Sequence, residues 1–181
     1  MISMYKASKP IALTGFMGVG KSSVARHLAH MLGTERVDLD TVIERTLHRS
    51  IADIVDKDGI KAFRDIESAC LSEVLAGRPP ILSLGGGAWT IEANRRIIRE
   101  HGMTTVWLES TFEHCWQNIR RSRKERPLAR NKERARSLFD ERQAVYCLAD
   151  WHFVIRADHT SYDIARQICD EVLELPASRE V

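Results

Sequence analysis

The residues best suited to chemistry form a glycine-rich loop near the start of the chain, GFMGVGKS at positions 15–22. Its spacing is G-x-x-x-x-G-K-S, in which the glycines let main-chain N–H groups wrap a phosphate chain without Cβ clashes. Lys21 supplies a point charge for the β- and γ-phosphates, and the Ser22 hydroxyl can ligate Mg²⁺. The loop therefore predicts a nucleotide site with Mg²⁺, and the alternative is a glycine-rich turn that binds nothing.

Two aspartates, Asp38 and Asp40, come at the end of the next expected strand. Alternation along a strand turns both side chains to the same face, so one carboxylate could serve the Mg²⁺ while the other meets a substrate hydroxyl. The simpler alternative is that Asp40 only caps a helix beginning at Thr41. Beside a phosphate-binding loop we favour the functional interpretation.

An arginine and a run of glycines indicate an anion site farther along the chain. Arg64 and Glu67 lie three residues apart on an expected helix, which is also the spacing of a plain surface ion pair. In the functional interpretation, Glu67 holds the Arg64 guanidinium for bidentate binding of an anion. The run Gly85, Gly86, Gly87 follows a strand, and it predicts either a close approach by a ligand or backbone, or an ordinary loop.

A basic segment lies between these motifs and the end of the chain. Residues 120–142 hold ten Lys/Arg and four Asp/Glu, although the whole chain has a net charge of only +2. Within it, the proline-interrupted stretch 122–133 is typical of a mobile loop. A lid that carries an arginine, here Arg126, over the γ-phosphate is a recurring part of phosphoryl-transfer sites. Charge alone leaves three interpretations open: such a lid, a nucleic-acid patch and a solvated helix face.

Short apolar runs predict the strands that must position these residues. They cover residues 10–14, 36–39, 81–84, 104–108 and 152–155. Longer segments with helical periodicity separate them, among them 21–32, 59–76 and 161–173. Strands that alternate with helices predict an α/β fold with a parallel sheet, which binds its ligand beyond the carboxyl ends of the strands. The candidate residues follow these runs, as that rule requires.

Length and composition predict one ordinary domain. The chain has 181 residues, of which 44% are hydrophobic and 29% charged, so we expect a single domain over 1–175 and a frayed tail over 176–181. No apolar run approaches the roughly 20 residues of a membrane span, and no signal peptide is recognisable. The four cysteines form no C-x-x-C pair, which disfavours zinc binding and fits a reducing compartment. We therefore expect a cytoplasmic protein that does not bind a membrane.

Six motifs, in this order and near these spacings, resemble the shikimate kinase family. They are the phosphate-binding loop, D-x-D at 38–40, F-R-x-x-E at 63–67, L-G-G-G-A at 84–88, R-P-L at 126–128 and R-x-x-x-Y at 142–146. The resemblance runs from about Ile11 to Ile168, and the combination is far more specific than the loop alone. It implies the P-loop fold of nucleoside-monophosphate-kinase type: a central five-stranded parallel sheet of order 2-3-1-4-5, flanked by helices, with a mobile lid near 122–133 and a substrate-binding region near 40–67.

The same resemblance implies an activity and assigns the residues. A monomer with no nucleic-acid partner would transfer the γ-phosphoryl group of ATP to the 3-hydroxyl of shikimate, giving shikimate 3-phosphate and ADP, with Mg²⁺ as cofactor. The catalytic residues would be Lys21, Asp40, which lies against the reacting hydroxyl, and Arg126. ATP would be bound by Gly15, Gly18, Val19, Gly20, Lys21, Ser22, Ser23 and Arg126, with Arg120 or Arg121 packed on adenine. Shikimate would be bound by Asp40, Arg64, Gly85, Gly86, Gly87 and Arg142, and Mg²⁺ by Ser22 and Asp38.

Two alternatives remain open. A related small-molecule kinase, such as a gluconate kinase or a nucleotide kinase, would need no paired arginines aimed at a ring carboxylate. A non-catalytic P-loop module for nucleotide sensing or nucleic-acid binding would have no need of Asp40.

Overall fold

A parallel sheet of five strands forms the centre of the molecule. The computed structural model describes residues 9–156 and 158–173. The strands are β1 (Ile11–Thr14), β2 (Val37–Asp38), β3 (Ile81–Ser83), β4 (Thr104–Glu109) and β5 (Trp151–Val154). Their order across the sheet is β2-β3-β1-β4-β5, and every neighbouring pair is parallel. The α/β class, the parallel sheet and its predicted order are thus confirmed.

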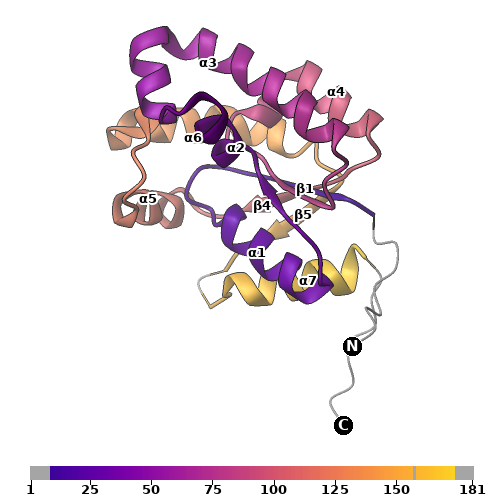
Figure 1. Ribbon diagram of the computed structural model, residues 1–181. Coiled ribbons are helices and arrows are strands. Elements are labelled where there is room, and N and C mark those ends of the chain that lie inside the picture. The colour runs from indigo at the N-terminus through magenta and orange to yellow at the C-terminus, as the bar shows by residue number, and fades with distance from the viewer. Residues whose placement is uncertain (1–8, 157, 174–181) are drawn as a thin grey trace.

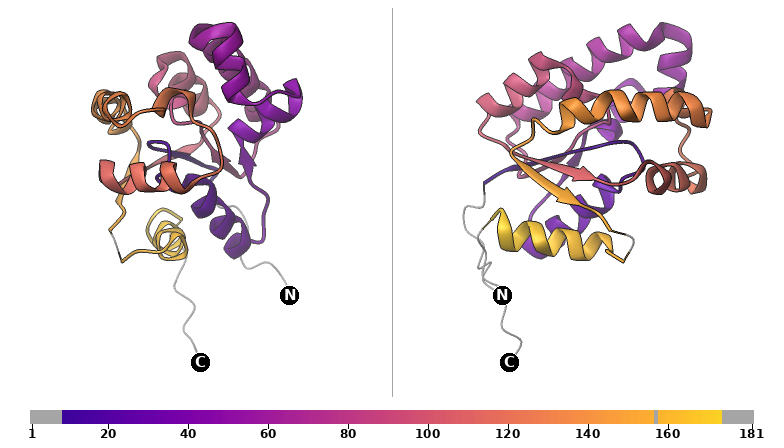
Figure 2. Two further views of the ribbon diagram at one scale, coloured as in Figure 1. Left: turned by 90° about the vertical axis from the view of Figure 1, so that its left-hand side faces the viewer. Right: turned by 180° about the vertical axis from the view of Figure 1, so that it is seen from behind.

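Helices cover both faces of this sheet. They are α1 (Lys21–Leu32), α2 (Leu39–Leu47), α3 (Ile51–Ala76), α4 (Glu92–Glu100), α5 (Phe112–Arg121), α6 (Lys132–Tyr146) and α7 (Ser161–Glu171), with short 3₁₀ turns η1 (Ala88–Thr90) and η2 (Pro127–Ala129). Helices α1 and α7 pack together on one face, while α3, α4 and α6 lie on the other (Figures 1 and 2). The sheet is therefore the middle of three layers, which explains why its central strand β1 is buried along its whole length.

The helix after the glycine-rich loop has the bounds that the sequence predicts. Val24, Leu28 and Leu32 recur at four-residue spacing and are buried toward the sheet. The helix ends where Gly33 adopts a left-handed conformation, with φ of 59°, and its N–H bonds back to the last turn. Local pattern alone was enough to place this element.

The third helix begins earlier than its periodicity predicts. We expected a start near Gly59, but α3 begins at Ile51, after Ser50 accepts a hydrogen bond from the Asp53 N–H at 3.1 Å. Gly59 is instead an interior break with φ of 88°. Only glycine adopts such an angle without strain, so it punctuates the helix rather than opening it.

Two further expectations concern the tail of the chain and membrane-spanning helices. The predicted tail over 176–181 lies outside the described residues. Among the residues that the structure describes, no helix combines the length and apolar character needed to cross a membrane.

Candidate functional site

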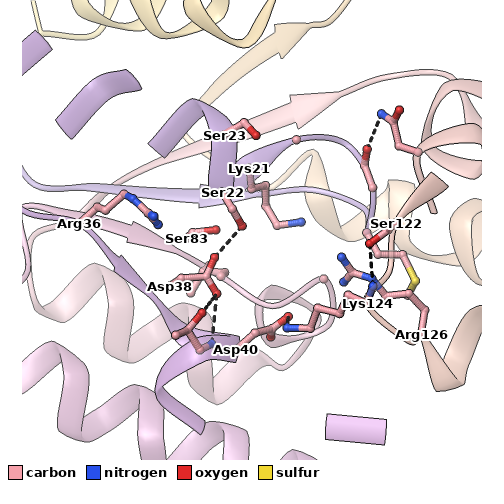
Figure 3. A pocket seen from close by; sticks show the side chains of 17 residues that line it. Lys21, Ser22, Ser23, Arg36, Asp38, Asp40, Ser83, Ser122, Lys124 and Arg126 are labelled. Atoms are coloured by element: carbon pink, nitrogen blue, oxygen red, sulfur yellow. Dashed lines mark hydrogen bonds and ion pairs between the residues drawn. The ribbon is translucent and has the colours of Figure 1, made fainter. Parts of the chain in front are cut away.

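A large cavity lies at the carboxyl ends of β1, β2 and β3, where the fold rule places a ligand. It has a volume of about 560 Å³. Its lining includes Gly18, Gly20, Lys21, Ser22, Ser23, Arg36, Asp38, Asp40, Ser83, Gly86, Asn118, Lys124 and Arg126. Figure 3 shows the labelled side chains converging on this space from the glycine-rich loop, from β2 and α2, and from the segment after α5. The structure thus brings together candidates that are more than 100 residues apart in sequence.

The glycine-rich loop is pressed against its neighbours. A Cβ on Gly15 would lie 2.5 Å from the Leu108 carbonyl oxygen, and one on Gly18 would lie 2.5 Å from that of Cys115. Both glycines also have positive φ, of 136° and 81°. The loop can therefore take this path between β4 and α5 only with glycine at these two positions.

Lys21 lies across the inside of this loop. Its Nζ donates hydrogen bonds to the carbonyl oxygens of Gly15 at 2.7 Å and Phe16 at 3.1 Å. Burial, together with the nearby positive charge of Arg126, lowers the pKa of Lys21 to about 8. A negatively charged phosphate chain bound beside this amine would favour its protonated, positively charged form.

Ser22 and Asp38 offer two oxygen ligands side by side. The Ser22 hydroxyl donates a hydrogen bond to Asp38 Oδ2 at 2.6 Å. Both are hard oxygen donors of the kind that Mg²⁺ takes, and the described residues contain no cluster of three or more acidic, histidine or cysteine side chains around a common point. Such a pair fits Mg²⁺ in its usual nucleotide-bound form, in which phosphates and water fill the other positions.

The two aspartates share the cavity but not the geometry that we expected. Asp38 ends β2 and caps α2, because its side chain accepts the Thr41 N–H at 3.2 Å. Asp40 lies in the first turn of α2, so the prediction of two aspartates alternating along a strand is wrong, as is the alternative that Asp40 is the cap. The capping bond at Asp38 ends the strand one residue before its predicted end at 39, so Asp40 lines the cavity from a helix.

A second cavity adjoins the first and is lined by the anion-binding candidates. It is lined by Met17, Asp40, Ile51, Val55, Phe63, Arg64, Glu67, Gly86, Gly87, Arg126, Pro127, Leu128 and Arg142. The two cavities share Asp40 and Arg126, together with Met17 and Gly86. A ligand in the second cavity would therefore meet the end of a phosphate chain beside Asp40 and Arg126.

The glycine triplet is explained by the side chains that lie on it. A Cβ on Gly87 would be 2.0 Å from Arg64 Nη2, and one on Gly85 would be 2.6 Å from Glu67 Oε1 and 2.8 Å from Asp40 Oδ1. The Gly86 carbonyl oxygen accepts a hydrogen bond from Arg142 Nη1 at 2.9 Å. The triplet is thus the surface against which the arginines and the carboxylates are placed.

Arg64 and Glu67 form the expected ion pair on α3, and it is not a surface pair. The Glu67 side chain is only 1% exposed. Burial raises the pKa of Glu67, and the charge of Arg64 opposes that rise. Removing one partner would leave a buried charge uncompensated, so the pair fixes the direction of the guanidinium.

Some predicted residues are not brought to either cavity. Arg120 and Arg121, at the end of α5, are exposed and line neither space, so their assignment to adenine stays a prediction. A smaller cavity of about 210 Å³ continues from the loop between His114, Asn118 and His159. The sequence did not indicate this cavity.

The sequence reasoning also missed Asn118 and Lys124. Asn118 Nδ2 donates to the Gly18 carbonyl oxygen at 2.8 Å and so supports the loop from α5. Lys124 lies in the segment already singled out for Arg126, but nothing in its spacing distinguished it from the other basic residues nearby. Both are identified only by their place at the cavity.

Comparisons with known proteins identify the family of this chain. The family model described as "Shikimate kinase" matches residues 17–174. A shikimate kinase from Ruegeria pomeroyi is 40% identical over 95% of this chain and 87% of its own length. One from Streptococcus thermophilus is 41% identical over 86% of this chain and 96% of its own. A solved structure of shikimate kinase from Acinetobacter baumannii in complex with shikimate has a TM-score of 0.85 and 32% identity, covering 94% of this chain and 96% of that one. Because the family model matches most of the length of this chain, the chain belongs to the shikimate kinase family.

Proposed function

We propose that this protein transfers the γ-phosphoryl group of ATP to the 3-hydroxyl of shikimate, giving shikimate 3-phosphate and ADP. The observation that carries the proposal is the junction of the two cavities at Asp40 and Arg126. One cavity has the features of a polyphosphate site, and the other has two arginines suited to a carboxylate. The junction places an acceptor hydroxyl and a γ-phosphate next to each other, which is the main requirement of phosphoryl transfer.

The phosphate side of the site is assigned to the loop and its helix. Main-chain N–H groups of residues 15–20 and the N-terminus of α1 face the phosphates. Lys21 balances the charge of the β- and γ-phosphates, and Ser22 with Asp38 would hold Mg²⁺, which supplies further charge neutralisation when bound. Arg126 adds a further positive charge to the lining of the same cavity. Its Nε is buried without a hydrogen-bond partner among the described residues. A buried donor that lacks a partner supports the assignment of an anion to this place.

The acceptor side is assigned to Arg64, Arg142 and the glycine triplet. The two guanidinium groups bind the shikimate carboxylate, while Asp40 accepts a hydrogen bond from the 3-hydroxyl and takes its proton. The second cavity encloses only about 50 Å³, and Pro127 and Leu128 are among the residues that line it. A ring of shikimate's size therefore requires residues 122–133 to open and close as a lid. All of these groups come from one chain, which supports a monomer as the active form.

The first test is substrate choice. Release of ADP is measured in a coupled assay with shikimate, gluconate and nucleoside monophosphates side by side. We expect turnover with shikimate and only background with the others. Turnover with gluconate or a nucleotide in preference to shikimate would replace the proposal with another small-molecule kinase.

Replacing Arg64 by lysine is expected to lower kcat/KM for shikimate at least several-fold, while ATP affinity changes little. An ammonium group keeps the charge but cannot form the two parallel hydrogen bonds of a guanidinium. Loss of a partner from a desolvated charge pair typically costs about 2–5 kcal/mol. Steady-state kinetics with each substrate varied in turn give the measurement. Wild-type kcat/KM for shikimate in Arg64→Lys would show that the carboxylate is bound elsewhere.

Binding of ADP near pH 8 is expected to take up protons through Lys21. With a pKa of about 8, the free lysine is half neutral at that pH. Phosphate charges beside it favour the protonated form and raise its pKa, so a proton is bound together with the nucleotide, and affinity falls as pH rises above about 8. Calorimetric titrations in two buffers of different ionisation enthalpy measure the uptake. The same uptake in Lys21→Met would assign the proton to another group.

A further inference from the structure

Resting on the function proposed above, we infer that Lys124 is an additional positioning residue of the reaction site. It orients the Asp40 carboxylate when residues 122–133 lie over the cavity. The Lys124 Nζ is 3.7 Å from Asp40 Oδ2 and 3.3 Å from Glu44 Oε2. Among the described residues, no other lysine, arginine or histidine pairs with Asp40. Figure 3 shows the amine of Lys124 directed at the Asp40 carboxylate.

Glu44 fixes the place of the lysine. It lies four residues after Asp40 on α2, so the two carboxylates share one face of the helix. Its other oxygen, Oε1, accepts the Ile51 N–H at the start of α3 at 3.1 Å. Glu44 is therefore anchored between two helices, and a lysine bound to it has little freedom in where its charge is placed.

The Asp40 carboxylate is then defined from both sides. Oδ1 faces Gly85 so closely that a Cβ there would lie 2.8 Å away, and Oδ2 faces Lys124. The Asp40 side chain is 19% exposed and that of Lys124 34%, so solvent screens this pair less than an open surface pair. The carboxylate is held in one orientation toward the junction of the two cavities.

This contact couples Asp40 to the lid. Lys124 precedes Arg126 by two residues, so the movement that places Arg126 over the phosphates also brings Lys124 to Asp40. The Asp40 carboxylate is then oriented only when Lys124 is in place, which restricts proton transfer to the closed site. A different interpretation is that Lys124 binds a phosphate directly, since it lines the same cavity.

A double-mutant cycle between Lys124 and Asp40 separates the two interpretations. We expect Lys124→Met to lower kcat about 10-fold, less than the roughly 10²-fold that a 1 Å misplacement can cost, with nucleotide affinity close to wild type. Glu44→Gln should lower kcat in the same direction by a smaller factor, and Lys124→Arg should retain most of the activity. In the Asp40→Asn background, Lys124→Met should add less than about twofold, because its action passes through the carboxylate. Lys61→Met, at a lysine that is 92% exposed on α3, is the matched control and should leave kcat unchanged.

Two kinetic results would overturn the inference, and so would one result from hydrogen exchange. One is weaker ADP binding in Lys124→Met with kcat unchanged at saturating ATP, and the other is an equal loss of kcat in the wild-type and Asp40→Asn backgrounds. Amide hydrogen exchange across residues 122–130 without ligand tests the contact itself, and it should rise in both Lys124→Met and Glu44→Gln. Unchanged exchange in both would also reject the inference. A wild-type protein that fails to phosphorylate shikimate would overturn the proposed function, whereas the exchange result decides the contact in either case.

Discussion

Replacing Asp40 by asparagine is expected to lower kcat with shikimate by about 10²-fold or more, the usual scale of removing a general base. The amide keeps the size of the side chain but cannot accept the proton of the attacking hydroxyl. Asp40 lies where the two cavities meet. Among the described residues it is the only carboxylate that lines both the phosphate side and the acceptor side of that junction. Steady-state kcat at saturating ATP and shikimate is the measurement.

Asp38→Asn provides the comparison, because its proposed role differs. Asp38 bonds to Ser22 and is assigned to Mg²⁺, so this variant should need more Mg²⁺ and recover partly when Mg²⁺ is raised. Asp40→Asn should not recover. An asparagine at 38 can still accept the Thr41 N–H, so unfolding midpoints should stay near wild type in both variants. Equal rescue would make Asp40 a metal ligand, and near-normal activity in Asp40→Asn would show that it is not the base.

Gly87→Ala is expected to lower kcat/KM for shikimate about 30-fold or more, corresponding to the lower end of the 2–5 kcal/mol lost when a buried charge pair is broken. The new Cβ would lie 2.0 Å from Arg64 Nη2 and 2.3 Å from Cζ, so the guanidinium must leave its place. Arg64 cannot move freely, because Glu67 beneath it is 1% exposed and would lose its partner. Kinetics with shikimate varied, together with ADP affinity, measure the effect.

Gly77→Ala is the matched control for this substitution. Gly77 has an ordinary φ of −74°, and the nearest atom to an added Cβ is the Val74 carbonyl oxygen at 3.3 Å. It closes the end of α3 away from both cavities, so kcat/KM should be unchanged. ADP affinity should be near wild type in both variants. A normal kcat/KM in Gly87→Ala would mean that the placement of Arg64 does not matter for shikimate.

Features that depend on neighbours within one or two turns were available from the sequence. The bounds of α1 follow from the apolar spacing of Val24, Leu28 and Leu32 and from the glycine that ends the helix. The phosphate-binding loop was recognisable because its backbone path requires glycine at fixed positions. The order of the strands came with the family resemblance, since periodicity gives the strands and their parallel direction but not which one is central.

Errors arose where two local signals competed. Asp38 and Asp40 can both act as helix caps, and alternation placed both on a strand. The hydrogen bond from Thr41 to Asp38 ended the strand and put Asp40 on the helix. Gly59 looked like a helix start, but the cap at Ser50 lies outside the apolar pattern that defined the helix.

Only the tertiary structure decided which distant side chains meet. Lys124 pairs with a residue 80 positions earlier, and the Gly87 main chain lies against the Arg64 guanidinium on another element. These contacts depend on how the crossovers of a parallel sheet bring separate segments to its carboxyl edge. A side-chain pattern repeats within an element and can be read along the chain, whereas a contact between elements is set by the packing of the whole domain.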